Sequence, residues 1–151
     1  MSSTSSRQII ERHASGQLPS LEKTEPDKAV STCLEWLARH DEQEVLAKHW
    51  QRLESYLIRE HHWFQLSRRE RAALPEASQL DAISNRLDKL YKLNQRLLNT
   101  LPEVKASSPH GLACKLSVAL ALVHPEENKE AHRLIQSVLL DVKASAPSVS
   151  E

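Results

Sequence analysis

The sequence predicts an all-α fold, and three observations support this prediction. The chain has 151 residues but only two glycines, and aromatic residues make up 4% of it. Leu, Ala, Glu, Lys and Arg are abundant, and these residues lose little side-chain freedom in a helix, whereas strands favour β-branched and aromatic residues. Apolar residues also recur every three or four positions over long stretches. We therefore expect a single-domain bundle of four to five amphipathic helices over residues 24–143.

The two ends of the chain differ in composition from this predicted bundle. Residues 1–23 are polar and rich in serine, with Gly16 and Pro19 interrupting any regular pattern. We expect them to form a mobile, disordered N-terminal arm. Residues 144–151 are expected to form a frayed tail.

The first helix is expected to begin at Thr24, with Pro26 in its first turn and Asp27 as the acidic member of a capping box. Its apolar face is Val30, Cys33, Leu34 and Leu37. The pattern then thins, so the sequence leaves open whether residues 37–45 break the helix. A second, stronger stripe follows: Leu46, Trp50, Leu53, Tyr56, Leu57, Glu60 and Phe64.

The middle of the chain predicts a short helix and then a long one. Ser67 and Glu70 have the spacing of a capping box, and Pro75 ends the short helix that they open. The long helix is expected to run from Glu76 to near Pro102. Its buried face is Leu80, Ile83, Leu87, Leu90, Leu97 and Leu101.

Two further helices are expected. Ser108 caps the first of them and Pro109 occupies its first position. Its buried face is Leu112, Leu116, Ala119, Leu120 and Val123. Cys114 lies on the other side of this helix, so we expect it to be partly exposed. Pro125 is expected to open the last helix, with Glu126 and Glu127 in the first turn, where the helix dipole favours negative charge. Its buried side is Ala131, Leu134, Ile135, Val138 and Leu139.

Charge and cysteine content limit the classes of function. Twenty basic residues balance twenty acidic ones, so no overall field attracts nucleic acid or an acidic membrane. Cys33 and Cys114 belong to no Cys-x-x-Cys motif and are interpreted as reduced thiols. The most apolar run, residues 116–123, is far shorter than the ~20 residues that a membrane helix needs. We expect a cytoplasmic, bacterial protein without a membrane segment.

The motifs of several common chemistries are missing from the sequence. It contains no Gly-rich phosphate loop, no Gly-x-Ser-x-Gly nucleophile elbow and no His-Glu-x-x-His zinc motif. The residues three before the histidines of the predicted helices are not acidic, which argues against a di-iron bundle. His40 and Glu44 are four residues apart, but two ligands do not make a metal site. We infer no metal, no cofactor, no small-molecule ligand and no catalytic residues, and the chain is interpreted as a non-enzyme.

The adjacent His61 and His62 precede Trp63 and Phe64. We interpret the histidines as the C-terminal turn of a helix, where the dipole favours positive charge. Trp63 and Phe64 are then expected to pack back against the bundle. The alternative is that the two aromatic residues form a contact surface for a partner.

Basic residues form two clusters. The first is Arg68, Arg69 and Arg71, and the second is Arg86, Lys89, Lys92 and Arg96. Such a stripe can contact phosphates, which makes a small nucleic-acid-associated regulator the alternative function. Against it, Asp81, Asp88 and Glu103 lie close by, and lysine and arginine stems commonly cover the edge of a core.

Three segments carry a resemblance: LPEA (residues 74–77), KASSPHGLACKL (residues 105–116) and HPEENKEAHRLIQSVLLDV (residues 124–142). Over residues 30–142 the chain resembles small all-helical proteins of unknown function from bacteria, chiefly alphaproteobacteria. In those proteins a small-residue turn, a Gly and a Lys four residues later open a helix, as at Gly111 and Lys115. The resemblance implies an all-helical single domain and no reaction.

The sequence therefore predicts a non-enzymatic helical protein–protein interaction module. Long amphipathic helices in a short chain often leave an apolar stripe for a second copy to cover, so we expect a homo-oligomer. The expected partner contacts are Trp63, Phe64, Leu90 and Leu97.

Overall fold

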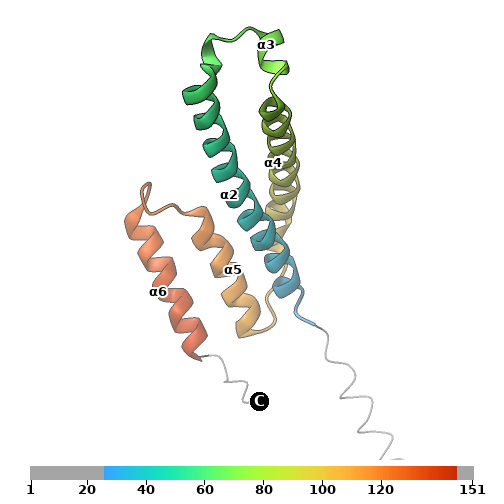
Figure 1. Ribbon diagram of the computed structural model, residues 1–151. Helices are drawn as coiled ribbons and strands as arrows, with labels where there is room; N and C mark the ends of the chain where they lie inside the picture. Colours follow the sequence, from blue (N-terminus) through green and yellow to red (C-terminus); the bar gives the residue numbers. More distant parts are fainter. Residues whose placement is uncertain (1–25, 146–151) are drawn as a thin grey trace, which may run out of the picture.

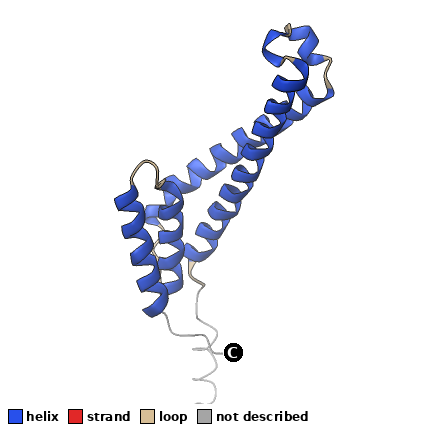
Figure 2. Ribbon diagram, turned by 60° about the vertical axis from the view of Figure 1, so that its left-hand side comes forward, coloured by secondary structure: helices blue, strands red, loops and turns tan. Residues whose placement is uncertain are grey.

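The computed structural model describes residues 26–145, which form five α-helices and no strand (Figure 1, Figure 2). The expected all-α fold is therefore confirmed. The N-terminal arm predicted for residues 1–23 lies outside the described residues, as do residues 146–151 of the predicted tail. None of the helices within residues 26–145 combines the length and the apolar character needed to cross a membrane.

The helices are α2 (Lys28–His61), α3 (Arg68–Ala72), α4 (Pro75–Thr100), α5 (Pro109–Leu122) and α6 (Lys129–Ser145), and the 3-10 turns are η1 (Trp63–Gln65) and η2 (Leu101–Glu103). Helices α2 and α4 form a long antiparallel pair, and α3 closes its far end (Figure 1). Helix α5 packs against α2, and α6 packs against α5. Figure 2 shows that the far end of the α2–α4 pair extends well beyond α5 and α6.

Helix α2 is continuous over 34 residues, so residues 37–45 do not break it. It begins one turn later than expected. Asp27 is not the third residue of a helix that Thr24 caps but is itself the N-cap, because its Oδ1 accepts a hydrogen bond from the Ala29 N–H at 3.0 Å. This is the Asp capping geometry that satisfies a free amide of a first turn.

The same Asp27 side chain joins α2 to the start of α5, eighty residues away. Its Oδ2 accepts hydrogen bonds from the Ser107 N–H at 3.1 Å and from the Ser108 hydroxyl at 2.6 Å. The Ser108 oxygen in turn accepts the Gly111 N–H at 3.0 Å, which is the predicted cap of α5. The Ser108 hydroxyl, together with the backbone N–H groups of Ala29 and Ser107, lowers the pKa of Asp27. One carboxylate therefore organises two helix starts.

The main core cluster lies where α2, η2 and α5 meet. Its members are Cys33, Trp36, Leu101, Cys114 and Val118. The prediction that Cys114 is partly exposed is wrong, since only 6% of it is accessible, and Leu112 is exposed instead. Helix α5 carries apolar residues around most of its circumference, so periodicity alone does not identify the face that meets α2. Burial raises the pKa of both thiols, which are free.

The α2–α4 contact follows the predicted leucine spacing. Helix α4 buries Leu80, Ile83 and Leu90, and it ends just before Pro102 as expected. It begins at Pro75, one residue before the predicted start. Asn94 is also buried in this contact, and its Nδ2 donates to the Trp36 carbonyl at 3.0 Å.

Helix α6 begins later than predicted. Pro125 and Glu126 lie in the turn after α5, and the helix starts at Lys129. The Asn128 Oδ1 accepts the Ala131 N–H at 3.0 Å and so supplies the cap. Leu139 is buried as expected, but Leu134 and Val138 are exposed. Since α5 is the helix against which α6 packs, it covers only part of the apolar side of α6.

Candidate functional site: a cleft at the tip of the helical hairpin

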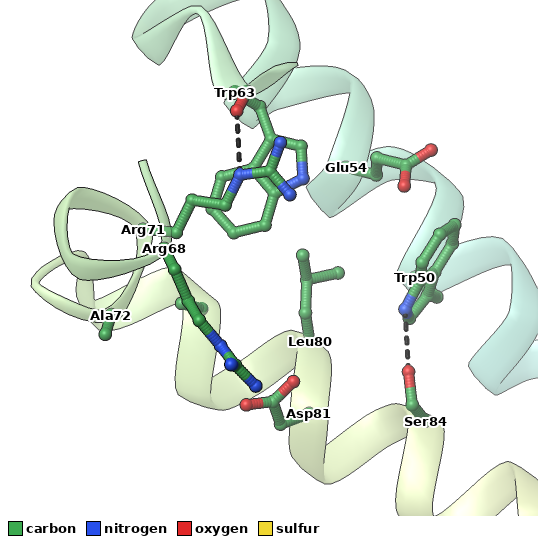
Figure 3. A pocket seen from close by; sticks show the side chains of 10 residues that line it. Trp50, Glu54, Trp63, Arg68, Arg71, Ala72, Leu80, Asp81 and Ser84 are labelled. Carbon is green, nitrogen blue, oxygen red and sulfur yellow. Dashed lines mark hydrogen bonds between the residues drawn. The ribbon is translucent and has the colours of Figure 1, made fainter. Parts of the chain in front are cut away.

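The far end of the α2–α4 pair contains a cleft of about 350 Å³, which we call the tip cleft (Figure 3). It lies between the last turns of α2, η1, α3 and the first turns of α4. The side chains that matter for its chemistry are Trp50, Glu54, Trp63, Arg68, Arg71, Leu80 and Asp81. Its lining thus combines two indoles, an apolar floor and charges of both signs.

Two local signals in the sequence build the tip. His62 adopts the left-handed conformation (φ 52°), and its N–H bonds the Leu57 carbonyl, so α2 ends at His61 as predicted. The predicted capping box of α3 is confirmed: the Ser67 hydroxyl accepts the Glu70 N–H at 3.2 Å, and a Glu70 oxygen accepts the Ser67 N–H at 2.9 Å. That backbone hydrogen bond lowers the pKa of Glu70. These two turns set the direction of Trp63 and of the α3 arginines.

Arg71 and Trp63 form a fixed pair. The Arg71 Nε donates to the Trp63 carbonyl oxygen at 3.0 Å, and the guanidinium carbon lies 4.7 Å from the centre of the indole (Figure 3). Stacking on an indole face stabilises a guanidinium and limits its rotation. On the other wall, the Trp50 Nε1 donates to the Ser84 hydroxyl at 3.0 Å. The Trp50 indole is therefore held by its own hydrogen bond, and the Trp63 indole is held by the guanidinium stacked on it.

The other charged groups of the cleft are distributed unevenly. Figure 3 shows the Arg68 guanidinium and the Asp81 carboxylate turned toward each other, whereas the Glu54 carboxylate points away from Arg71. Among residues 26–145, the ion pairs within 4.0 Å include neither Arg68 nor Arg71, and only Arg68 has a carboxylate turned toward it. The positive charge of Arg71 is therefore not neutralised by a neighbouring carboxylate.

The structure separates the four residues predicted to contact a partner. Trp63 is half-buried in the cleft wall, whereas Phe64 is 67% exposed and does not pack back as expected. Leu90 is only 1% exposed, and Leu97 packs at the edge of the core cluster. The leucine spacing of α4 identifies a buried face, but it does not say whether α2 or another chain covers it. Here α2 covers it, so Leu90 belongs to the core of this chain.

The structure also separates the two basic clusters. Arg68 and Arg71 line the tip cleft, and Arg69 is exposed beside it. The second cluster lies farther along α4. Its Arg86 binds both carboxylate oxygens of Glu42, at 2.6 and 2.9 Å, which lowers the pKa of Glu42 and raises that of Arg86.

Within the second cluster, Lys92 pairs with Asp88 at 2.8 Å. Lys89 and Arg96 line a shallow hollow on the outer side of α4 together with these two residues. Half of this predicted phosphate-binding stripe is therefore already paired with carboxylates.

The histidines do not assemble into a metal site in the part of the chain that is described. His40 stacks on Trp36, with ring centres 5.0 Å apart, and its Nε2 lies 3.5 Å from Glu44. His61 contacts Tyr56 edge to face. Within residues 26–145, no three His, Cys, Asp or Glu side chains come together in a way that could hold a metal ion.

Sequence reasoning missed two features of this protein. The sequence places Trp50 and Leu80 on helix faces and Asp81 beside the basic clusters, but it does not indicate that the three residues complete the tip cleft. The link from Asp27 to Ser107 and Ser108 joins residues eighty positions apart, and no local spacing predicts it.

Comparison of the chain with protein-family models, curated proteins and solved structures gives no match. The resemblance to small bacterial helical proteins therefore stays a prediction.

Proposed function

We propose that this chain is a non-enzymatic helical protein–protein interaction module that self-associates. The observation that carries this proposal is that large apolar side chains remain exposed at both ends of the described fold. Phe64 stands exposed at the tip of the α2–α4 pair, and Leu134 and Leu140 are 67% and 61% exposed on α6. Aromatic and aliphatic side chains of this kind are typical anchors of protein interfaces.

The arrangement of the helices supports the proposal. The contacts run from α4 to α2, then to α5, then to α6, so the outermost helices each have one main helical neighbour within residues 26–145. The exposed apolar residues of these outermost helices would be covered if a second chain packed against them. The tip cleft, which is lined by two tryptophans, lies next to the exposed Phe64 and offers a further contact surface. A cytoplasmic location is part of this proposal.

The nucleic-acid alternative has less support. Arg86 and Lys92 are engaged with Glu42 and Asp88. Phosphate binding at these positions would first have to break contacts that already exist. Retention on DNA or RNA columns as a function of salt concentration tests this alternative directly.

Light scattering after size exclusion, over a range of protein concentrations, tests the proposed function. We expect the mass of the wild-type protein to rise with concentration. Phe64→Ser tests the tip and the double variant Leu134→Ser/Leu140→Ser tests α6. The variant that removes the side chains at the centre of the interface should weaken association by roughly 30-fold or more.

Tyr91→Ser is the matched control, because Tyr91 is also an exposed aromatic residue but lies on α4 outside the tip cleft. A wild-type protein that stays monomeric at every concentration would overturn the self-association. A Tyr91→Ser variant that weakens association as strongly as the Phe64 and α6 variants would overturn the assignment of the interface to the tip or to α6.

A further inference from the structure

We propose that the tip cleft is a binding site for a carboxylate that a partner chain carries next to an apolar side chain. This inference rests on the proposed function, because it names the chemistry of the segment that an interaction module would recognise. The carboxylate would bind Arg71, and the apolar side chain would lie on Leu80 and Trp50.

The first argument is the state of Arg71. Its Nε is used by the Trp63 carbonyl, and its guanidinium is stacked on the indole, so its orientation is fixed before any ligand arrives. The two terminal nitrogens of the guanidinium form no hydrogen bond with other described residues. An oriented guanidinium with free N–H groups favours a planar, bidentate anion such as a carboxylate.

The second argument is the balance of charge within the cleft. The Asp81 carboxylate faces Arg68, and the Glu54 carboxylate points away from Arg71 (Figure 3). Arg71 is therefore the cation of the cleft that lacks a facing carboxylate. A ligand that places a negative charge beside Arg71 is attracted to its guanidinium, whereas a neutral or cationic ligand is not.

The third argument is the apolar surface next to this cation. Leu80 is almost fully buried and forms the floor, and the indole of Trp50 is held in place by its hydrogen bond to Ser84. Figure 3 shows Leu80 lying between the two tryptophans. A ligand site of this kind commonly combines an apolar surface with one or two placed polar groups. An aliphatic side chain adjacent to the carboxylate fits this combination.

Nuclear magnetic resonance with small probes tests the proposal on the full-length protein. The probes are N-acetyl-leucine, which carries the carboxylate, N-acetyl-leucinamide, which is neutral, and leucinamide, which is cationic. The chain has three tryptophans, so three indole N–H signals report binding. Those of Trp50 and Trp63 should shift, and that of Trp36, which is 3% exposed and belongs to the core cluster, serves as the internal control.

We expect N-acetyl-leucine to bind with a dissociation constant on the order of millimolar, as is typical of so small a ligand. It should bind about tenfold tighter than N-acetyl-leucinamide, because a hydrogen bond to a charged group is lost in the amide. Arg71→Gln should abolish this preference. Arg69→Gln, on the same short helix but outside the cleft lining, should keep it.

A second pair of probes distinguishes the two sources of the carboxylate. A dipeptide with a free C-terminal leucine presents a main-chain carboxylate, and an amidated Glu-Leu dipeptide presents a side-chain carboxylate. Equal binding of acid, amide and amine probes to the wild type would overturn the proposal, as would tighter binding of leucinamide. Neither result changes the mass seen by light scattering, so failure of this site and failure of self-association are distinguishable.

Discussion

Replacing Gly111 by alanine should break the connection between the starts of α2 and α5. A Cβ atom at this position would lie 2.7 Å from the Asp27 Cγ and 3.0 Å from its Oδ1. The Asp27 side chain is short and accepts hydrogen bonds from Ala29, Ser107 and Ser108, so it cannot retreat from the Cβ atom without disturbing them. The carboxylate must therefore move and give up hydrogen bonds at both helix starts.

The size of the effect follows from two opposing contributions. Adding a methyl group to a packed site costs ~1–3 kcal/mol. An alanine in place of glycine within a helix recovers up to ~1 kcal/mol. We expect the free energy of unfolding to fall by about 1–2 kcal/mol, which corresponds to a decrease in melting temperature of roughly 3–8 °C.

Thermal unfolding followed by far-ultraviolet circular dichroism measures this change, and a double-mutant cycle with Asp27→Ala identifies its cause. In the Asp27→Ala background the methyl group meets no carboxylate, so Gly111→Ala should be neutral or stabilising there. If Gly111→Ala destabilised both backgrounds equally, the contact with Asp27 would not be the cause. A Gly111→Ala protein more stable than the wild type would also refute the reasoning.

Three further predictions concern pH and the core. The folded-state pKa of Asp27 is lowered, so its contribution to stability is complete above the unfolded pKa and is lost as the pH falls through the folded value. Asp27→Asn should accordingly flatten the acid limb of a stability–pH profile, and an unchanged limb would contradict this. Asn94→Leu removes a buried Oδ1 that has no hydrogen-bond partner among the described residues, but it also removes the Nδ2 hydrogen bond to the Trp36 carbonyl. Because an unpaired buried acceptor costs more than one hydrogen bond contributes, the free energy of unfolding should rise by about 1 kcal/mol in urea titrations. Leu90→Ala should lower that free energy by about 2–5 kcal/mol without changing the dissociation constant of the proposed oligomer. If Leu90 contacted a partner instead, the dissociation constant would rise and the free energy of unfolding would change little.

Local signals in the sequence predicted the starts of α3 and α5 and the end of α2, but they placed the starts of α2 and α6 too early. Ser67 and Glu70 are three residues apart, and Ser108 lies three residues before Gly111, so each cap depends on a few neighbouring positions. The end of α2 at His61 is likewise a local event. Such caps depend on a few neighbouring positions, whereas the cap of α2 is Asp27, which also accepts tertiary hydrogen bonds from Ser107 and Ser108.

Predictions that required knowing the neighbour of a helix succeeded less well. Helix α5 has apolar residues on most sides, so the burial of Cys114 and the exposure of Leu112 depend on where α2 packs. Leu134 has the spacing of a buried position, yet α5 does not cover it. The tip cleft is assembled from four separate elements, and the Asp27 link closes a loop of eighty residues. A periodic pattern identifies an apolar face, but it does not identify what the face meets.

The unbroken length of α2 has a mechanical consequence. This helix contacts α5 near one end and presents the tryptophan cleft at the other, and its 34 residues measure about 50 Å along the axis. It therefore acts as a lever arm: a tilt of roughly 5° at the α5 end would displace the far end by roughly 4 Å, given that length. A change at the Asp27 joint that tilted α2 would in this way move the surface that we propose as the docking site.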